Sequence, residues 1–161
     1  MLSKELATIE YLSDCVIEFG VLEPDADLYL PARIINTDGT VTNTRIKAND
    51  AMFYVEYGSV SVPGAFLLEK CRLYADRLID EVFSELIDDI VENGQGVDYA
   101  KSKIREMCLK IQDRVRNELR RYVTKTNVLN RALGQPEENS RFVVDLNELA
   151  SYVRCEAKFK N

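Results

Sequence analysis

The side chains in this 161-residue chain that could do chemistry are carboxylates and thiols, because the sequence contains no histidine. A serine or cysteine nucleophile usually needs an imidazole base, and most catalytic transition metals take an imidazole ligand. The adjacent Asp88 and Asp89 could hold a divalent ion, but their surroundings lack the ligand spacing of a calcium loop. We therefore expect no enzymatic activity, cofactor or metal. A hydrolase built on Asp88 or Asp145 is the weakest alternative.

Four cysteines are spread along the chain at positions 15, 71, 108 and 155. No two of them have the CxxC spacing of a zinc knuckle. They sit among apolar residues, as Cys108 does between Met107 and Leu109. We expect reduced thiols that act as small core side chains, rather than metal ligands or redox groups.

The charge is distributed unevenly, although the composition (46% apolar, 30% charged) is that of a soluble globular protein. Residues 1–99 carry 7 basic and 19 acidic side chains, whereas residues 100–131 carry 10 basic and 3 acidic ones. Such a division predicts that one part of the molecule attracts another, within a chain or between copies. The apolar runs are too short to cross a membrane and the N-terminus does not resemble a signal peptide, so we expect no membrane partner.

The first third of the sequence alternates short helical and extended patterns. Residues 3–12 predict a short helix, and the β-branched and aromatic residues 15–22 predict a strand. Residues 28–35 are a second extended candidate, although Pro31 favours an edge or a bend there. The sequence Asp38-Gly39 is typical of a tight hairpin turn.

Two long helices dominate the centre of the chain. Residues 51–57 alternate in a way that predicts a strand, and a short loop follows. Apolar residues then recur at three–four spacing from 67 to 91, which predicts a helix with an acidic opposite face. A second amphipathic pattern over 98–123 predicts a helix that carries the basic cluster.

The last third predicts further strands after a polar stretch. Residues 124–140 are polar and predict a loop or arm, and residues 141–145 and 151–159 predict extended segments. The whole chain predicts a single α+β domain, residues 1–161. In it a small, mainly antiparallel sheet, with an extended hairpin arm at about 28–47, packs against the two long helices.

One segment, residues 53–68, has a more specific amino-acid sequence than the rest of the chain. Residues 53–59 read FYVEYGS, a short loop with Pro63 follows, and Phe66 opens the first long helix. Physically this predicts a strand, a sharp exit at Gly58 and a helix start. The wording resembles the "hEfGt … iPaRpFlr" motif of the tail-completion and head–tail joining (neck) proteins of tailed bacteriophages.

Two more stretches resemble the same family, in the same order. Residues 16–22 (VIEFGVL) are similar to its early strand, and residues 142–157 are similar to its "PLvDTG.L..SI.yeV" stretch. The chain departs from the family at Gly64-Ala65, at Glu69, and at Leu146-Asn147, where the family usually has Thr-Gly.

The resemblance implies a structural virion protein at the neck or the top of the tail, assembled in the host cytoplasm. It implies a ring of about six copies that completes the tail and joins it to the head connector. The expected partners are further copies, head-connector and tail-tube or terminator proteins, and DNA that passes without sequence-specific binding. The residues expected at the subunit interface are Tyr54, Glu56, Tyr57, Gly58, Pro63, Phe66, Arg114, Arg116, Arg120, Asp145, Ser151 and Arg154.

Two alternatives stay open at this point. Glu56 is either a solvent-facing residue of an alternating strand or a polar contact to a neighbouring subunit. The basic helix over 100–121 could instead serve a cytosolic nucleic-acid-binding or regulatory module. Its arginines lie on several sides of the helix without an aromatic stacking platform, so we favour contact with solvent or with an acidic neighbour, such as the acidic face of the preceding helix in the next copy.

Overall fold

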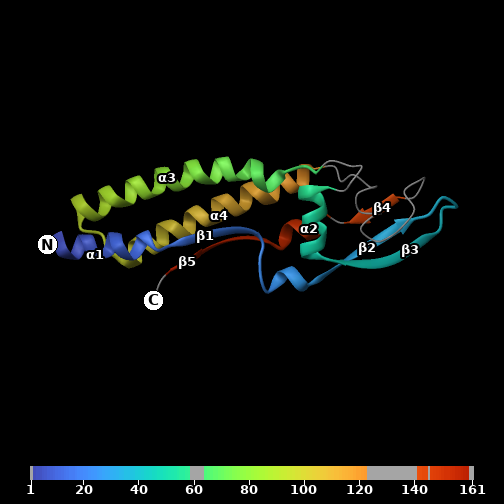
Figure 1. The fold of residues 1–161 in the computed structure, drawn as a ribbon, viewed down its shortest axis with the longest axis horizontal. Helices are drawn as coiled ribbons and strands as arrows, with labels where there is room; N and C mark the ends of the chain where they lie inside the picture. The colour runs from blue at the N-terminus through green and yellow to red at the C-terminus, as the bar shows by residue number, and fades with distance from the viewer. Residues whose placement is uncertain (1, 59–63, 123–140, 145, 160–161) are drawn as a thin grey trace. The chain divides into compact units, whose positions relative to one another are not determined.

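The computed structural model describes residues 2–58, 64–122, 141–144 and 146–159. These residues form an α+β fold, which confirms the fold class predicted from the sequence. The elements, labelled in Figure 1, are α1 (Leu2–Ser13), β1 (Val16–Val21), η1 (Asp25–Asp27), β2 (Tyr29–Ile35), β3 (Val41–Lys47), α2 (Ala48–Tyr57), α3 (Leu67–Asn93), α4 (Val97–Arg121), β4 (Arg141–Val144), α6 (Leu146–Ser151) and β5 (Val153–Lys158). The polar loop or arm predicted over 124–140 lies outside the described residues.

The chain divides into two compact units. Unit 1 comprises Met1–Phe19, Cys71–Arg114 and Cys155–Asn161, and unit 2 comprises Gly20–Lys70 and Val115–Arg154. Each unit combines helices with strands. No helix in the described part of the chain is long and apolar enough to cross a membrane.

Unit 1 is built on the two long helices, which run antiparallel beside each other (Figure 1). Both were predicted from their three–four apolar spacing, and that spacing places the largest side chains in the core. Leu86 and Ile90 of α3 are buried, as are Ile104, Met107 and Ile111 of α4. The acidic side chains of α3 lie mainly on its exposed face, as predicted.

The two-stranded sheet pairs β1 with β5. Along β5, Val153 and Cys155 are buried while Arg154 and Lys158 are exposed, which confirms the half-buried alternation predicted for this segment. In unit 1, Lys158 Nζ lies 3.1 Å from a carboxylate oxygen of Glu18.

Unit 2 contains a three-stranded antiparallel sheet in the order β3-β2-β4. The hairpin turn at Asp38-Gly39 is confirmed. The Thr40 N–H and hydroxyl donate to Asp38 Oδ1 at 2.9 and 2.6 Å, which lowers the pKa of that carboxyl. Pro31 lies opposite Arg45 of β3, and the described pairing between β2 and β4 begins at the next residue, Ala32.

The strand predicted over 51–57 is wrong, because these residues belong to helix α2. The buried side chains of α2 include Ala48, Ala51, Met52 and Val55, which recur with the helical period. Apolar residues at positions 53, 55 and 57 alternate as in a strand, but in so short a segment this alternation arises by chance. The element that precedes α3 in the chain is therefore a helix, rather than the predicted strand.

Candidate interaction site

A tight corner joins the end of α2 to the start of α3, within unit 2. The N–H of Gly58, whose φ is 74°, donates to the carbonyl of Tyr54 at 3.0 Å and closes α2. The chain then folds back on the helix, because Ala65 N–H donates to Val55 O at 2.9 Å and Phe66 N–H to Glu56 O at 3.0 Å. These backbone bonds fix the segment from residue 64 onward against the last turn of α2.

Gly64 permits this close approach. A Cβ atom at position 64 would lie 2.1 Å from Glu56 O and 2.5 Å from the carbonyl carbon of Tyr57. Both neighbours are backbone atoms that cannot rotate away, so only glycine fits. The glycine at position 64, where the chain departs from the family motif, is therefore required by the packing of this chain.

Glu56 ties the two helices together. Its side chain is only 3% exposed, and its two carboxylate oxygens accept the N–H groups of Leu68 at 2.7 Å and Glu69 at 3.1 Å. These N–H groups belong to the first turn of α3, where backbone donors have no partner within the helix. The carboxylate thus caps α3 from outside, and its charge is favoured by the helix dipole.

Neither alternative predicted for Glu56 is correct. Both put the residue in a strand, facing either solvent or a neighbouring subunit, whereas the structure buries it in α2 with two intramolecular donors. Glu56 therefore positions the neighbouring predicted interface residues indirectly, because it holds the start of α3 against α2.

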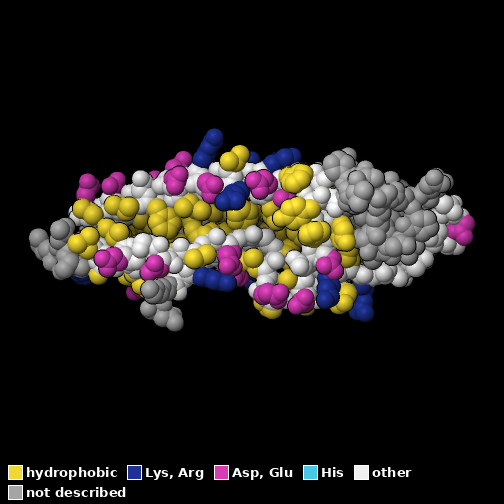
Figure 2. Space-filling model, viewed as in Figure 1, with side chains coloured by type: hydrophobic (Ala, Val, Ile, Leu, Met, Phe, Trp, Pro, Cys, Tyr) yellow, Lys and Arg dark blue, Asp and Glu magenta, His cyan; other side chains and the backbone are white. Residues whose placement is uncertain are grey.

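Three aromatic rings project from this corner into solvent. Phe53, Tyr57 and Phe66 are 52%, 59% and 48% exposed. Their rings contact one another, with centroids 5.0 Å apart for Phe53 and Tyr57 and 6.4 Å for Tyr57 and Phe66. We name these three residues the aromatic corner. Figure 2 shows hydrophobic side chains gathered over α2.

Phe66 holds its ring there at a conformational cost. Its φ is 49°, in the left-handed region that side chains with a Cβ rarely adopt. Such a residue costs roughly 1 kcal/mol or more, and it persists only where the surroundings determine it. Here the backbone bond from its N–H to Glu56, and the bond from Lys70 N–H to its carbonyl at 3.0 Å, provide that constraint.

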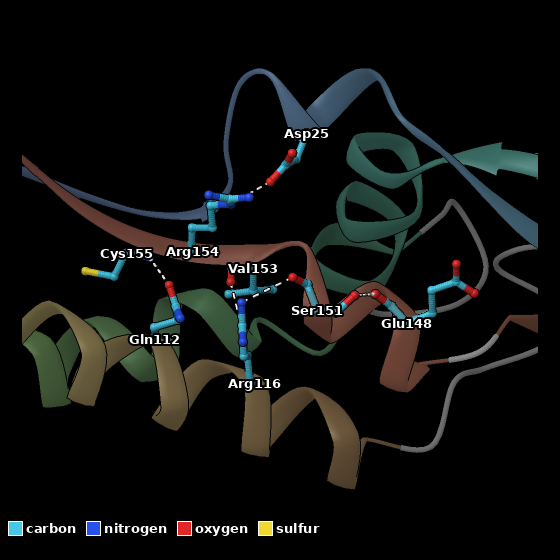
Figure 3. A network of polar contacts seen from close by, with 8 residues as sticks. All are labelled: Asp25, Gln112, Arg116, Glu148, Ser151, Val153, Arg154 and Cys155. Carbon is cyan, nitrogen blue, oxygen red and sulfur yellow. Dashed lines mark hydrogen bonds and ion pairs between the residues drawn. The ribbon is translucent and has the colours of Figure 1, made fainter.

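A second polar arrangement in unit 2 uses three of the predicted interface residues (Figure 3). Arg116 of α4 points towards the turn between α6 and β5, where its guanidinium donates to Val153 O at 3.0 Å and Ser151 O at 3.1 Å. Arg154 pairs with Asp25 Oδ2 at 2.6 Å. These contacts assign Arg116, the carbonyl of Ser151 and Arg154 to internal bracing.

Removing the Arg116 side chain is expected to destabilise the protein. In Arg116→Ala, two carbonyls at the turn after α6 lose a charged donor, which should lower the free energy of unfolding by about 2 kcal/mol. Urea denaturation followed by circular dichroism measures the change. Lys110→Ala, which shortens an exposed lysine on the same helix, is the control and should stay within about 0.5 kcal/mol of wild type. Equal effects of the two variants would contradict the bracing role.

The remaining predicted interface residues are distributed as follows. Tyr54 is half-buried with its ring 5.5 Å from that of Phe53, so it supports the aromatic corner from within α2. The Arg114 guanidinium lies 4.9 Å from the centre of the Tyr74 ring in unit 1. Pro63 and Asp145 lie outside the described residues.

Of the two carboxylates considered for catalysis, Asp88 is exposed on α3 and Asp145 lies outside the described residues. No three cysteine or carboxylate side chains there lie close enough together to hold a metal ion. Asp89 accepts a hydrogen bond from the Tyr99 hydroxyl at 3.0 Å, which raises the pKa of Tyr99. A hollow between α3 and α4 is lined by this pair together with Glu85, Lys103, Glu106 and Lys110, a mixture of charges that favours no single ligand.

All four cysteines are free thiols, and Cys15, Cys108 and Cys155 lie near one another in unit 1. Cys108 and Cys155 are buried as predicted, and Cys15 is half-buried. A hydrogen bond between the Cys108 and Cys155 thiols lowers the pKa of Cys108 and raises that of Cys155. Burial raises the pKa of Cys15. Gln112 Oε1 accepts the N–H of Cys155 at 3.1 Å, which fixes this part of β5 (Figure 3).

Sequence reasoning missed some of the residues that build these two arrangements. Phe53 is exposed because α2 is a helix, and the strand prediction gave its side chain no such role. Asp25 lies in η1, and its pairing with Arg154 joins residues far apart in the sequence. For the corner, the one signal that could have been used is Gly64 itself, since it follows a proline and precedes a helix start.

Comparison with protein families, with curated proteins and with solved structures gave no match to this chain. Its function must therefore be inferred from the residues, their geometry and the wording of the three family-like stretches. Of these, the aromatic corner is the clearest physical feature, because three exposed rings in mutual contact form an apolar surface.

Proposed function

We propose that this chain is a non-catalytic structural protein of a tailed-phage virion. In this proposal, about six copies form a ring at the neck or the top of the tail, completing the tail and joining it to the head connector. Its partners are further copies, the head-connector protein and the tail-tube or terminator protein. The chain assembles in the host cytoplasm, and DNA passes the ring without sequence-specific contacts.

The observation that carries this proposal is the aromatic corner. Phe53, Tyr57 and Phe66 expose about half of each side chain, and each ring is held in place by backbone contacts or by another ring. Aromatic residues on a rigid element give large contact areas with little loss of conformational entropy on binding. A buried glutamate and a sterically required glycine fix their scaffold, which suits a surface built for assembly.

The placement of the three family-like stretches also supports the proposal. Residues 16–22 and 142–157 contribute β1 and β5, which pair with each other. The stretch over 53–68 contributes the corner, and α2 contacts α6. A Cβ atom at Gly20 would lie 3.7 Å from the Leu68 side chain, so the first and second stretches are also in contact. Stretches that resemble one family and pack together are consistent with a shared fold.

The contacts of α4 weigh against a nucleic-acid-binding module. Lys101 lies over the stacked rings of Tyr11 and Phe159, at 5.1 and 5.2 Å from their centres. Arg116 binds two carbonyls, and Arg121 pairs with Glu118 at 3.8 Å. Side chains committed to partners within the chain are less available to phosphates.

Serine at two positions of the aromatic corner should weaken self-association. In the variant Phe53→Ser/Tyr57→Ser two anchoring rings are lost, so we expect the association constant to fall by at least about tenfold. Sedimentation velocity over a range of concentrations measures the constant, and electron microscopy shows whether rings form. Circular dichroism checks that both proteins are folded.

The matched control is Leu73→Ser, which removes an apolar side chain that is 70% exposed on α3. It should leave association within about threefold of wild type. Wild-type protein that stays monomeric would overturn the ring, and so would a double variant that associates as well as wild type. A monomer whose DNA affinity falls steeply with salt would instead favour the nucleic-acid-binding module.

A further inference from the structure

The aromatic corner carries a carboxylate on the same exposed stripe of α2. Asp50, Phe53 and Tyr57 are spaced three and four residues apart, which places them on one face of the helix, and all three are exposed. A carboxylate beside aromatic ring faces attracts a cation through charge and through the ring quadrupoles together. This chemistry selects an arginine in preference to an apolar side chain.

Most basic side chains of α4 are already engaged within the chain. Lys101, Arg105 and Arg114 lie over aromatic rings, while Lys103 and Arg121 pair with glutamates of the same helix. Arg116 is held by two backbone carbonyls. Each of these side chains therefore has a structural use that explains its presence.

Lys110 and Arg120 are the two exceptions within α4. Of these two, Arg120 is the arginine. It is exposed in the last turn of α4, and its guanidinium makes no hydrogen bond or ion pair with another residue in the described part of the chain. Arginine is enriched in the centres of protein interfaces, where its planar group stacks on rings while its N–H groups bind carboxylates. Arg120 thus has the chemistry that the stripe of Asp50, Phe53 and Tyr57 would recognise.

Each unit already contains an arginine that lies over a tyrosine ring. In unit 1, Arg114 lies 4.9 Å from the centre of the Tyr74 ring, and in unit 2, Arg45 lies 5.2 Å from that of Tyr29. Lys47 contacts both a ring and a carboxylate. Its Nζ lies 6.0 Å from the centre of the same Tyr29 ring and 3.9 Å from Asp27 Oδ1. A cation shared between a ring and a carboxylate is therefore an arrangement that this sequence already forms.

We propose that Arg120 of a second copy docks on the aromatic corner, with its guanidinium over the rings and paired with Asp50. This inference rests on the proposed function, and it names the contact that would join neighbouring copies. Because donor and acceptor surfaces differ, the contact is heterologous, and repeating it generates a ring when the rotation between copies closes. The corner then supplies the apolar area and Asp50 supplies the orientation.

A charge exchange tests this pairing in the 161-residue chain. Asp50→Arg and Arg120→Asp each place like charges opposite one another, so each should lower the association constant by about tenfold or more. The combined variant restores opposite charges in reverse and should return to within about threefold of wild type. Lys110→Asp makes the same charge change elsewhere on α4 and should have no such effect.

Each outcome decides between distinct possibilities. The Arg120 contact is supported if association is weakened in both single variants and restored in the combined variant. If the combined variant associates no better than the single ones, or if Arg120→Asp associates like wild type, the inference fails. Should the serine variant of the aromatic corner still weaken association in that case, the proposed function stands with another occupant at the corner. Monomeric wild-type protein would overturn both.

Discussion

Replacing Gly64 by alanine is expected to lower the free energy of unfolding by about 3 kcal/mol. The added methyl group would lie 2.1 Å from Glu56 O, and the next nearest atoms also belong to the backbone of α2. To avoid this contact the chain must move away from α2, which lengthens the bonds from Ala65 and Phe66 to that helix. Guanidinium or urea denaturation measures the change, with circular dichroism as the signal.

Gly96→Ala is the matched control for this prediction. A Cβ atom at position 96 meets nothing within 4 Å, so its cost is limited to the weaker capping of α4 by alanine, about 1 kcal/mol at most. The self-association of Gly64→Ala should fall as well, because the displaced segment carries Phe66. If Gly64→Ala unfolds at the same denaturant concentration as wild type, the tight corner does not exist in solution.

The second large effect is expected at Glu56. In Glu56→Ala the N–H groups of Leu68 and Glu69 lose their acceptors, and a cavity replaces a buried side chain. We expect a loss of about 3 kcal/mol in the free energy of unfolding. Glu56→Gln keeps one oxygen acceptor and the volume but turns an amide donor towards an N–H group, so its loss should be smaller, about 2 kcal/mol.

Glu81→Ala provides the control for Glu56. Glu81 lies in the middle of α3 on its exposed face, so its loss should change stability by no more than about 0.5 kcal/mol. Hydrogen exchange of the first turn of α3 adds a local measurement. Faster exchange there in Glu56→Ala, with unchanged exchange in the middle of α4, would locate the effect at the corner. Uniform exchange across both helices would argue that Glu56 acts only through global stability.

The long helices were predictable because their signal is repeated many times. In α3 the three–four apolar spacing continues over the whole element, so single exceptions do not disturb it. The hairpin between β2 and β3 was predictable for a different reason, since Asp38-Gly39 satisfies a local backbone requirement. In both cases the information lies within the segment itself.

Helix α2 was mispredicted because the short window over 51–57 cannot separate two periods. Phe53, Val55 and Tyr57 alternate as in a strand, whereas Ala48, Met52 and Val55 follow a helix. The deciding residues come before position 51, where a helix start directly after β3 had no capping signal in the sequence. The buried glutamate added to the error, because its partners are N–H groups of another helix.

The interface predicted from the sequence stays a prediction. Tyr57 and Phe66 were among its expected residues and both are exposed, although the strand-to-helix interpretation expected the Phe66 ring to pack on the sheet. The predicted interface also grouped Arg116 with Arg120, although their helix positions give one a pair of carbonyl partners and leave the other exposed. Such a difference depends on which segment packs beside each turn of α4, and no local pattern encodes it.

At Phe66 the left-handed backbone sets the stability of the fold against the exposure of an aromatic ring. Glycine would adopt a φ of 49° without penalty, and would relieve roughly 1 kcal/mol of strain. It would also remove one of the three rings from the surface. A chain selected only to fold should carry glycine here, so the presence of phenylalanine is itself a sign that the exposed ring has a use.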